Sequence, residues 1–175
     1  EYSMTNQYVF EEYTGFTEDE VKALCERFDM DFAQTSSWYD GYRFKKYKHI
    51  YNPRSVVAAM YNRDFSSYWT STETYDALKI YMDMDFDGLR TDIVQMLGGE
   101  CIRVNTQSFQ NDMRNFETKD DVLTLLIHLG YLGYDSETEE AFIPNKEIIR
   151  EFENAMSVGG WTEVMRVLQA SEKLL

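Results

Sequence analysis

The stretch from Trp38 to Tyr51, WYDGYRFKKYKHIY, has the clearest pattern in the chain. Asp40-Gly41 between aromatic residues is a turn signal, because a type I′ turn needs positive φ at both central positions. Residues 42–44 and 49–51 then predict two short strands, joined by a lysine-rich turn at 45–48. We therefore expect an aromatic β-hairpin region here.

Helices are predicted on both sides of this hairpin. Upstream, Thr17 with Glu20 forms a capping box, and the apolar stripe behind it predicts a helix at about 18–29. Downstream, Asn52-Pro53 is typical of a helix start, since Asn suits the N-cap and Pro the first turn. Residues 68–71 open a further helical region, which ends at Gly98-Gly99.

The second half of the chain predicts a different order of elements. Residues 101–104 read as a strand, and Thr118 with Asp121 starts a helix. Two short strands follow around a polar acidic turn at 135–140, and Asn145 then caps another helix. A helix, a hairpin wing and a second helix are compatible with a winged-helix-like unit. The fold class expected is α+β, mainly helical with short hairpins.

We divide the chain by these patterns into four segments. The first residue is Glu1 rather than Met, and the last stretch is helical to Leu175, so we expect a part of a longer protein. The predicted segments are 1–16, continuing something upstream; 17–104, a helical module with the aromatic β-hairpin region; 105–157, the winged-helix-like unit; and 158–175, a C-terminal linker helix.

Composition restricts the class of protein. The 175 residues carry a formal charge of −14, from 17 Lys and Arg against 31 Asp and Glu. Such a surface repels a nucleic acid duplex, so no nucleic acid partner is expected. No apolar run approaches the ~20 residues of a membrane span. Two cysteines without a CxxC pair suit a reducing compartment, and we expect a cytoplasmic protein.

One motif resembles a metal site. Residues 83–88, DMDFDG, match the first six places of an EF-hand calcium loop. The twelfth place, where a bidentate Glu is needed, is Val94, which fits an apolar helix face instead. Three carboxylates before a helix are also favoured by its dipole. The calcium candidates are Asp83, Asp85 and Asp87. Because the twelfth ligand is missing, we expect no metal site there.

The sequence predicts no complete catalytic site in this chain. It contains no GxxxxGK[ST] loop and no GxGxxG after a strand, and the lone His49 and His128 are expected to be structural. Aromatic residues around the hairpin could stack on bases, but core and cross-strand packing is the commoner role. The candidate ligand or interface residues are Trp38, Tyr39, Asp40, Tyr42, Arg43, Tyr51, Asn52, Tyr68 and Trp69.

An apolar stripe follows the Gly159-Gly160 break at the end of the chain. Its residues recur at helical spacing, which predicts an amphipathic helix. Two roles are open for it, an interface with a partner domain or the last core helix of this part. The candidate interface residues are Trp161, Val164, Met165 and Leu168.

Six stretches, in this order, resemble a known family: FTEDEV at 16–21, WYDGYRF at 38–44, YNPRSV at 51–56, YW at 68–69, GYL at 130–132 and IPN at 143–145. The series is similar to the C-terminal half of the predicted AAA-ATPase-like proteins of bacteria, which are often fused to a PD-(D/E)XK nuclease-like domain. The similarity covers about residues 10–157. Two places depart from it: Arg54 stands where a large aromatic residue is expected, and Lys45-Lys46 where a glycine is expected.

The resemblance implies a lid-type helical module and a winged-helix-like unit that follow a nucleotide-binding core. The P-loop and Mg-binding acid would lie upstream, and the nuclease-like domain downstream. ATP and Mg are thus implied for the whole protein, an ATPase, and no cofactor or catalytic residue for this part. It would be a non-catalytic, regulatory part that couples the ATPase core to the nuclease-like effector.

Two alternative functions stay open. One is a nucleic-acid-binding module that serves the nuclease, which a basic surface patch would favour. The other is a small-ligand or protein-interaction domain that uses the aromatic hairpin, which a closed aromatic pocket would favour.

Overall fold

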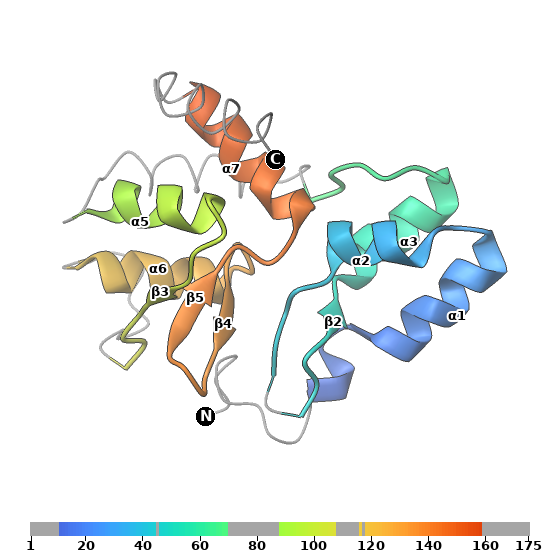
Figure 1. Ribbon diagram of the computed structural model, residues 1–175, viewed down its shortest axis with the longest axis horizontal. Coiled ribbons are helices and arrows are strands. Elements are labelled where there is room, and N and C mark those ends of the chain that lie inside the picture. The colour runs from blue at the N-terminus through green and yellow to red at the C-terminus, as the bar shows by residue number, and fades with distance from the viewer. Residues whose placement is uncertain (1–10, 45, 70–87, 108–115, 117, 159–175) are drawn as a thin grey trace.

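The computed structural model describes residues 11–44, 46–69, 88–107, 116 and 118–158. Within these residues, six α-helices accompany one two-stranded and one three-stranded antiparallel sheet. The predicted fold class, α+β and mainly helical with short hairpins, is confirmed. Figure 1 shows two units side by side, which we call the helical module (11–69) and the winged-helix-like unit (88–158).

The helical module is built on a small two-stranded sheet and three helices. β1 pairs antiparallel with β2, with Phe16 opposite Tyr51. The helices pack on this pair around a core that includes Val21, Tyr39 and Val56. In chain order, the elements are η1 (Glu11–Tyr13), β1 (Phe16–Thr17), α1 (Glu18–Phe28), α2 (Phe32–Tyr39), β2 (Ile50–Tyr51) and α3 (Pro53–Asn62).

Local capping residues set the starts of α1 and α3, as the sequence predicts. The Thr17 N–H donates to Glu20 Oε2 at 2.8 Å, and the Thr17 hydroxyl accepts from the Glu20 N–H, which completes the capping box. Asn52 Oδ1 accepts from the N–H of Arg54 at 3.0 Å, with Pro53 at the first turn of α3. Each cap satisfies backbone donors that the helix leaves unpaired.

The predicted aromatic hairpin is partly wrong. Trp38 and Tyr39 end helix α2, which begins where Asp31 Oδ1 accepts from the Gln34 N–H at 2.7 Å. Asp40 is extended at φ −78° and Gly41 has φ 122°, so the two residues do not form the type I′ turn. Tyr42 meets Ile50 in a single bridge, because β2 pairs with β1 instead.

The winged-helix-like unit contains helices around a three-stranded sheet of order β3-β5-β4. Ala141 on the central strand lies opposite both Ile102 and Tyr134. The order of helix, two strands and helix at 118–158 is the one that the sequence predicts. The elements are α5 (Leu89–Leu97), β3 (Ile102–Arg103), α6 (Lys119–His128), β4 (Gly133–Asp135), β5 (Glu140–Phe142) and α7 (Lys146–Val158).

The boundary between the units differs from the predicted one between residues 104 and 105. Leu89 and Ile93 of α5 and Val104 after β3 belong to the same hydrophobic core as Leu126 and Phe152. β3 also pairs with β5, far along the chain. Strand pairing and core packing therefore place 88–104 in the winged-helix-like unit, although local patterns had grouped them with the helical module.

Candidate functional site at the seam between the units

The two units meet along a surface that we call the seam. On one side lie residues 38–43 and 67–69 of the helical module. On the other side lie residues 130–133 and 142–151, including the first half of α7, which packs on α2 (Figure 1). Most of the polar contacts between the units described below lie in this surface.

Asn145 joins the units while it starts α7. Its Oδ1 accepts from the Ile148 N–H at 3.0 Å, which caps the helix. Its Nδ2 donates to the Asp40 carbonyl oxygen at 2.8 Å. Beside it, Gly41 has φ 122°, and a Cβ there would lie 2.2 Å from the Pro144 carbonyl oxygen. The chain at 40–41 and the chain at 144–145 thus touch backbone to backbone.

Tyr42 and Arg43 extend this contact along the edge of the winged-helix-like unit. The Tyr42 hydroxyl donates to the Gly130 carbonyl oxygen at 2.7 Å. Burial raises the pKa of Tyr42, so the hydroxyl stays a donor in the physiological range. The Arg43 guanidinium lies over the Phe142 ring, 4.6 Å from its centroid, in cation–π geometry.

Two buried carboxylates hold residues 67–69 at the seam. Glu147 Oε1 accepts from the Tyr68 N–H at 2.7 Å, and Glu151 Oε1 accepts from the Ser67 hydroxyl at 2.6 Å. Each glutamate is 1 % exposed, and they are one helical turn apart on α7. Burial raises the pKa of both, and these hydrogen bonds offset part of that shift.

The predicted site residues divide between the seam and the module core. Trp38 is buried beneath the Arg150 guanidinium, which lies 4.5 Å from its ring centroid. Inside the module, the Tyr39 hydroxyl donates to the Ser66 carbonyl oxygen at 3.0 Å, and the Tyr51 hydroxyl to Ser36 Oγ at 3.2 Å. Those at the seam are Trp38, Asp40, Tyr42, Arg43, Tyr68 and Trp69. The side chains of Tyr39 and Tyr51 belong to the module core, and Asn52 caps α3.

Sequence reasoning missed Glu147 and Glu151 as seam residues. Two glutamates four residues apart on a helix usually mark a solvated face. His49, expected to be structural, has its Nδ1 2.6 Å from Asp40 Oδ2, and its side chain is 54 % exposed. The burial of the two glutamates has no local signal in the sequence, because their partners Tyr68 and Ser67 lie 79 and 84 residues away along the chain.

A cavity of about 250 Å³ opens at the seam, on the side of α6. Four predicted site residues line it, namely Tyr42, Tyr51, Asn52 and Trp69. Tyr51 is buried, and burial raises its pKa to about 12. The cavity therefore gathers residues from both units around aromatic rings.

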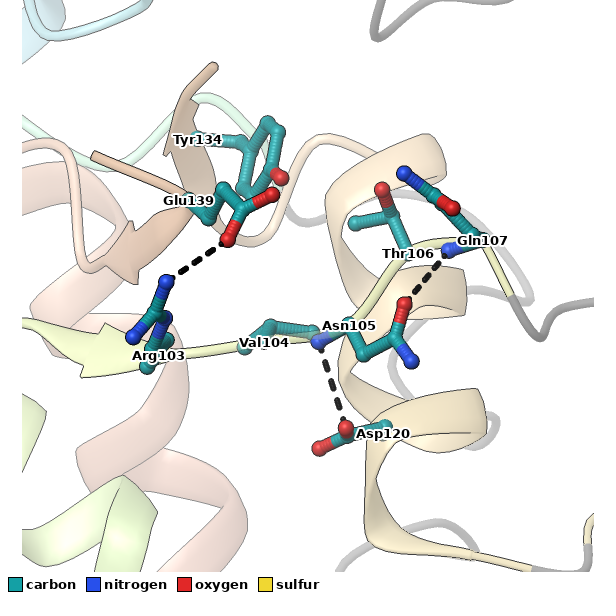
Figure 2. A pocket seen from close by; sticks show the side chains of 8 residues that line it. All are labelled: Arg103, Val104, Asn105, Thr106, Gln107, Asp120, Tyr134 and Glu139. Atoms are coloured by element: carbon teal, nitrogen blue, oxygen red, sulfur yellow. Dashed lines mark hydrogen bonds and ion pairs between the residues drawn. The ribbon is translucent and has the colours of Figure 1, made fainter. Parts of the chain in front are cut away.

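A second cavity, of about 290 Å³, lies between the end of β3, the start of α6 and the β4–β5 hairpin (Figure 2). Its polar groups bond one another: Arg103 Nη2 lies 2.9 Å from Glu139 Oε2, and the Asn105 N–H donates to Asp120 Oδ2 at 3.2 Å. The Arg103 side chain is 79 % exposed, and such surface pairs contribute little to stability. Two carboxylates oppose a phosphate here, so the cavity does not suit a nucleotide.

Helix α6 precedes the wing, where a DNA-binding winged helix places its groove-reading helix. Residues 121–127 of α6 are all buried, so this helix is central to the core. The hairpin after it carries Asp135, Glu137, Glu139 and Glu140. Neither feature suits a polyanion.

The remaining predicted sites lie outside the described residues. These are the calcium candidates Asp83, Asp85 and Asp87, and the stripe Trp161, Val164, Met165 and Leu168. Among the residues that the structure describes, no group of three or more His, Cys, Asp or Glu side chains is placed to hold a metal ion. None of the described helices has the length and hydrophobicity that a bilayer crossing requires.

Comparison with known protein families, curated proteins and solved structures gives no match. The family resemblance stays a prediction, carried by the six stretches quoted for it.

Proposed function

We propose that this chain is a non-catalytic, regulatory part of an AAA-ATPase-like protein, which couples the ATPase core to a nuclease-like effector. One observation carries the proposal: three stretches of the resemblance, far apart in sequence, meet at the seam. Asp40 bonds Asn145, and Tyr42 bonds Gly130. Gly41 lies against the Pro144 backbone.

The role of these stretches supports coupling over catalysis. Residues typical of the resemblance hold one unit against the other, through backbone contacts and buried hydrogen bonds. Two units held this way move as one body, and a rigid body transmits a displacement from one end to the other. In the whole protein, the helical module would contact the ATPase core and the winged-helix-like unit would lead to the effector.

The acidic hairpin and the buried α6 support protein partners over nucleic acid. ATP and Mg would bind in the upstream core. We place the protein in the cytoplasm, since Cys25 and Cys101 are free thiols.

The proposal places an ATPase core before Glu1 and an effector after Leu175, and the coupling role is tested in that longer gene product. Gly41→Ala should break the seam, because its Cβ would meet the Pro144 carbonyl oxygen. Gly99→Ala is the matched control: Gly99 also has positive φ, but a Cβ there meets nothing within 4 Å. We expect ATP to change amide exchange in the downstream domain of the parent and of Gly99→Ala, and not of Gly41→Ala.

Two results would contradict the proposal. One is a gene with no P-loop upstream of this chain. The other is micromolar binding of Mg-ATP by this chain alone in a calorimetric titration, since the chain lacks the glycine-rich loop that cradles phosphates.

A further inference from the structure

The seam cavity of about 250 Å³ is shared between the units and has mainly apolar walls. Tyr42 and Phe44 come from the helical module, and Leu129 and Gly130 from the end of α6. Trp69 closes a further side. Ligand sites are common where two structural units meet, so the position itself favours a binding role.

Two of the aromatic walls, Tyr42 and Trp69, are held by contacts within the protein. The Tyr42 hydroxyl is bonded to the Gly130 carbonyl oxygen, 2.7 Å away. The Trp69 ring packs edge to face on Tyr131, with centroids 5.9 Å apart. Gly130 has φ 82°, and a Cβ there would come within 3.0 Å of the Trp69 ring, so glycine preserves this arrangement. A prearranged site loses little entropy on binding.

The size and chemistry of the cavity select the class of ligand. At about 250 Å³ the cavity is smaller than the usual site for a drug-sized ligand, so it suits a one- or two-ring molecule. Aromatic rings prefer other rings in offset or edge-to-face contact. Burial lowers the pKa of His128 at the wall, so its imidazole is mainly neutral at pH 7 and adds no charge.

We infer that the seam cavity binds a small planar aromatic molecule, held among Tyr42, Phe44 and Trp69. This site goes beyond the coupling role and does not depend on it. A molecule in this place touches both units at once. Its binding stabilises the docked arrangement, because a ligand that binds only the folded, closed form shifts the equilibrium toward that form.

Indole is the probe, titrated into the full 175-residue chain and followed by two-dimensional amide NMR. We expect saturable shifts at residues 42–44 and 128–130, with a Kd of about 1 mM or tighter for a ligand this small. Cyclohexylmethanol, similar in size but not planar, should bind at least about tenfold more weakly. Shifts that do not saturate, that centre elsewhere, or that are equal for both probes would overturn the inference.

Phe44→Ala tests the wall directly, because Phe44 is half-buried and outside both hydrophobic cores. It should weaken indole binding at least about tenfold, and Phe44→Tyr should restore it. Tyr61→Ala, on an 86 % exposed ring of α3 away from the cavity, is the control and should bind like the parent. Unchanged binding in Phe44→Ala would refute the site. If Phe44→Ala does not fold, weaker binding by Phe44→Leu, whose side chain is apolar but not aromatic, supports the site and equal binding refutes it.

Discussion

The cores of the two units are made of different residues. The winged-helix-like unit is filled mainly by aliphatic side chains, among them Ile93, Leu123 and Ile148, under a three-stranded sheet. The helical module places Trp38, Tyr39 and Tyr51 at its centre, under a sheet of two residue pairs. In the winged-helix-like core, Tyr131 lies edge to face with both Trp69 and Phe152. The module core is thus richer in aromatic residues, and the winged-helix-like core richer in aliphatic ones.

This difference suggests that the units depend on the seam unequally. A two-stranded sheet is marginal alone, whereas three strands with a packed face are self-supporting. The helical module gains Asn145, Glu147 and Glu151 as hydrogen-bond partners at the seam. We therefore expect loss of the seam to loosen the module more than the winged-helix-like unit.

The largest effect is expected from Phe152→Ala in α7. Phe152 is fully buried and lies edge to face with Tyr131. Its loss should lower the free energy of unfolding by about 3–5 kcal/mol, as for other large-to-small core changes. Urea unfolding followed by circular dichroism measures this. Because α7 packs on both units, amide exchange should rise in both. A rise in the winged-helix-like unit alone would show that the helical module does not depend on α7.

Gly41→Ala should come next, with a loss of roughly 2–4 kcal/mol. A Cβ at this position combines backbone strain at φ 122° with a clash against a carbonyl oxygen that cannot rotate away. Gly99→Ala carries strain alone, at about 1 kcal/mol. Thermal melts of both variants separate the cost of backbone strain from the cost of the clash with Pro144. Equal losses would mean that the contact with Pro144 yields easily.

Asn145→Ala should cost about 2 kcal/mol, since it removes a helix cap and a hydrogen bond between the units. Asn145→Ser separates the cap from the hydrogen bond, because a serine hydroxyl can cap α7 but is too short to reach the Asp40 carbonyl oxygen as the amide does. We expect Asn145→Ser to recover about half of the loss in chemical denaturation. Full recovery would show that the bond to Asp40 is dispensable.

Tyr42→Phe should cost about 1 kcal/mol, the usual value of one buried hydrogen bond, here to the Gly130 carbonyl. Hydrogen exchange should rise at residues 42–44 more than in α6. An equal rise in both places would argue that the seam and the winged-helix-like core open together.

The smallest expected effect is a pH dependence at Glu147. Burial raises its pKa in the folded state, so the folded chain binds this proton more tightly than the unfolded chain. Its contribution favours folding at acid pH and is lost as the pH rises through the raised pKa. Glu147→Gln keeps an acceptor for Tyr68 and removes the titration. Between about pH 4 and pH 8 the melting temperature should fall less in the variant than in the parent. Parallel curves would show that folding does not change the pKa of Glu147.

The sequence predicted those elements that short-range signals determine. Capping residues at Thr17, Asn52, Thr118 and Asn145 marked four helix starts correctly. Helix α2 was missed, since Asp40-Gly41 between aromatic residues resembles a hairpin turn until its dihedral angles are known. The unit boundary and the carboxylate pair were missed for a shared reason, because both depend on partners far along the chain.

The two roles of Asn145 restrict which residues can replace it, and so offer a search signature. Aspartate caps a helix but cannot donate to Asp40, and glutamine can donate but is a poor cap. Gly41 is restricted as well, by the Pro144 backbone beside it. Distant relatives with this seam should therefore keep a glycine at position 41 together with an asparagine before α7. Alignments of divergent chains can be anchored on these two positions.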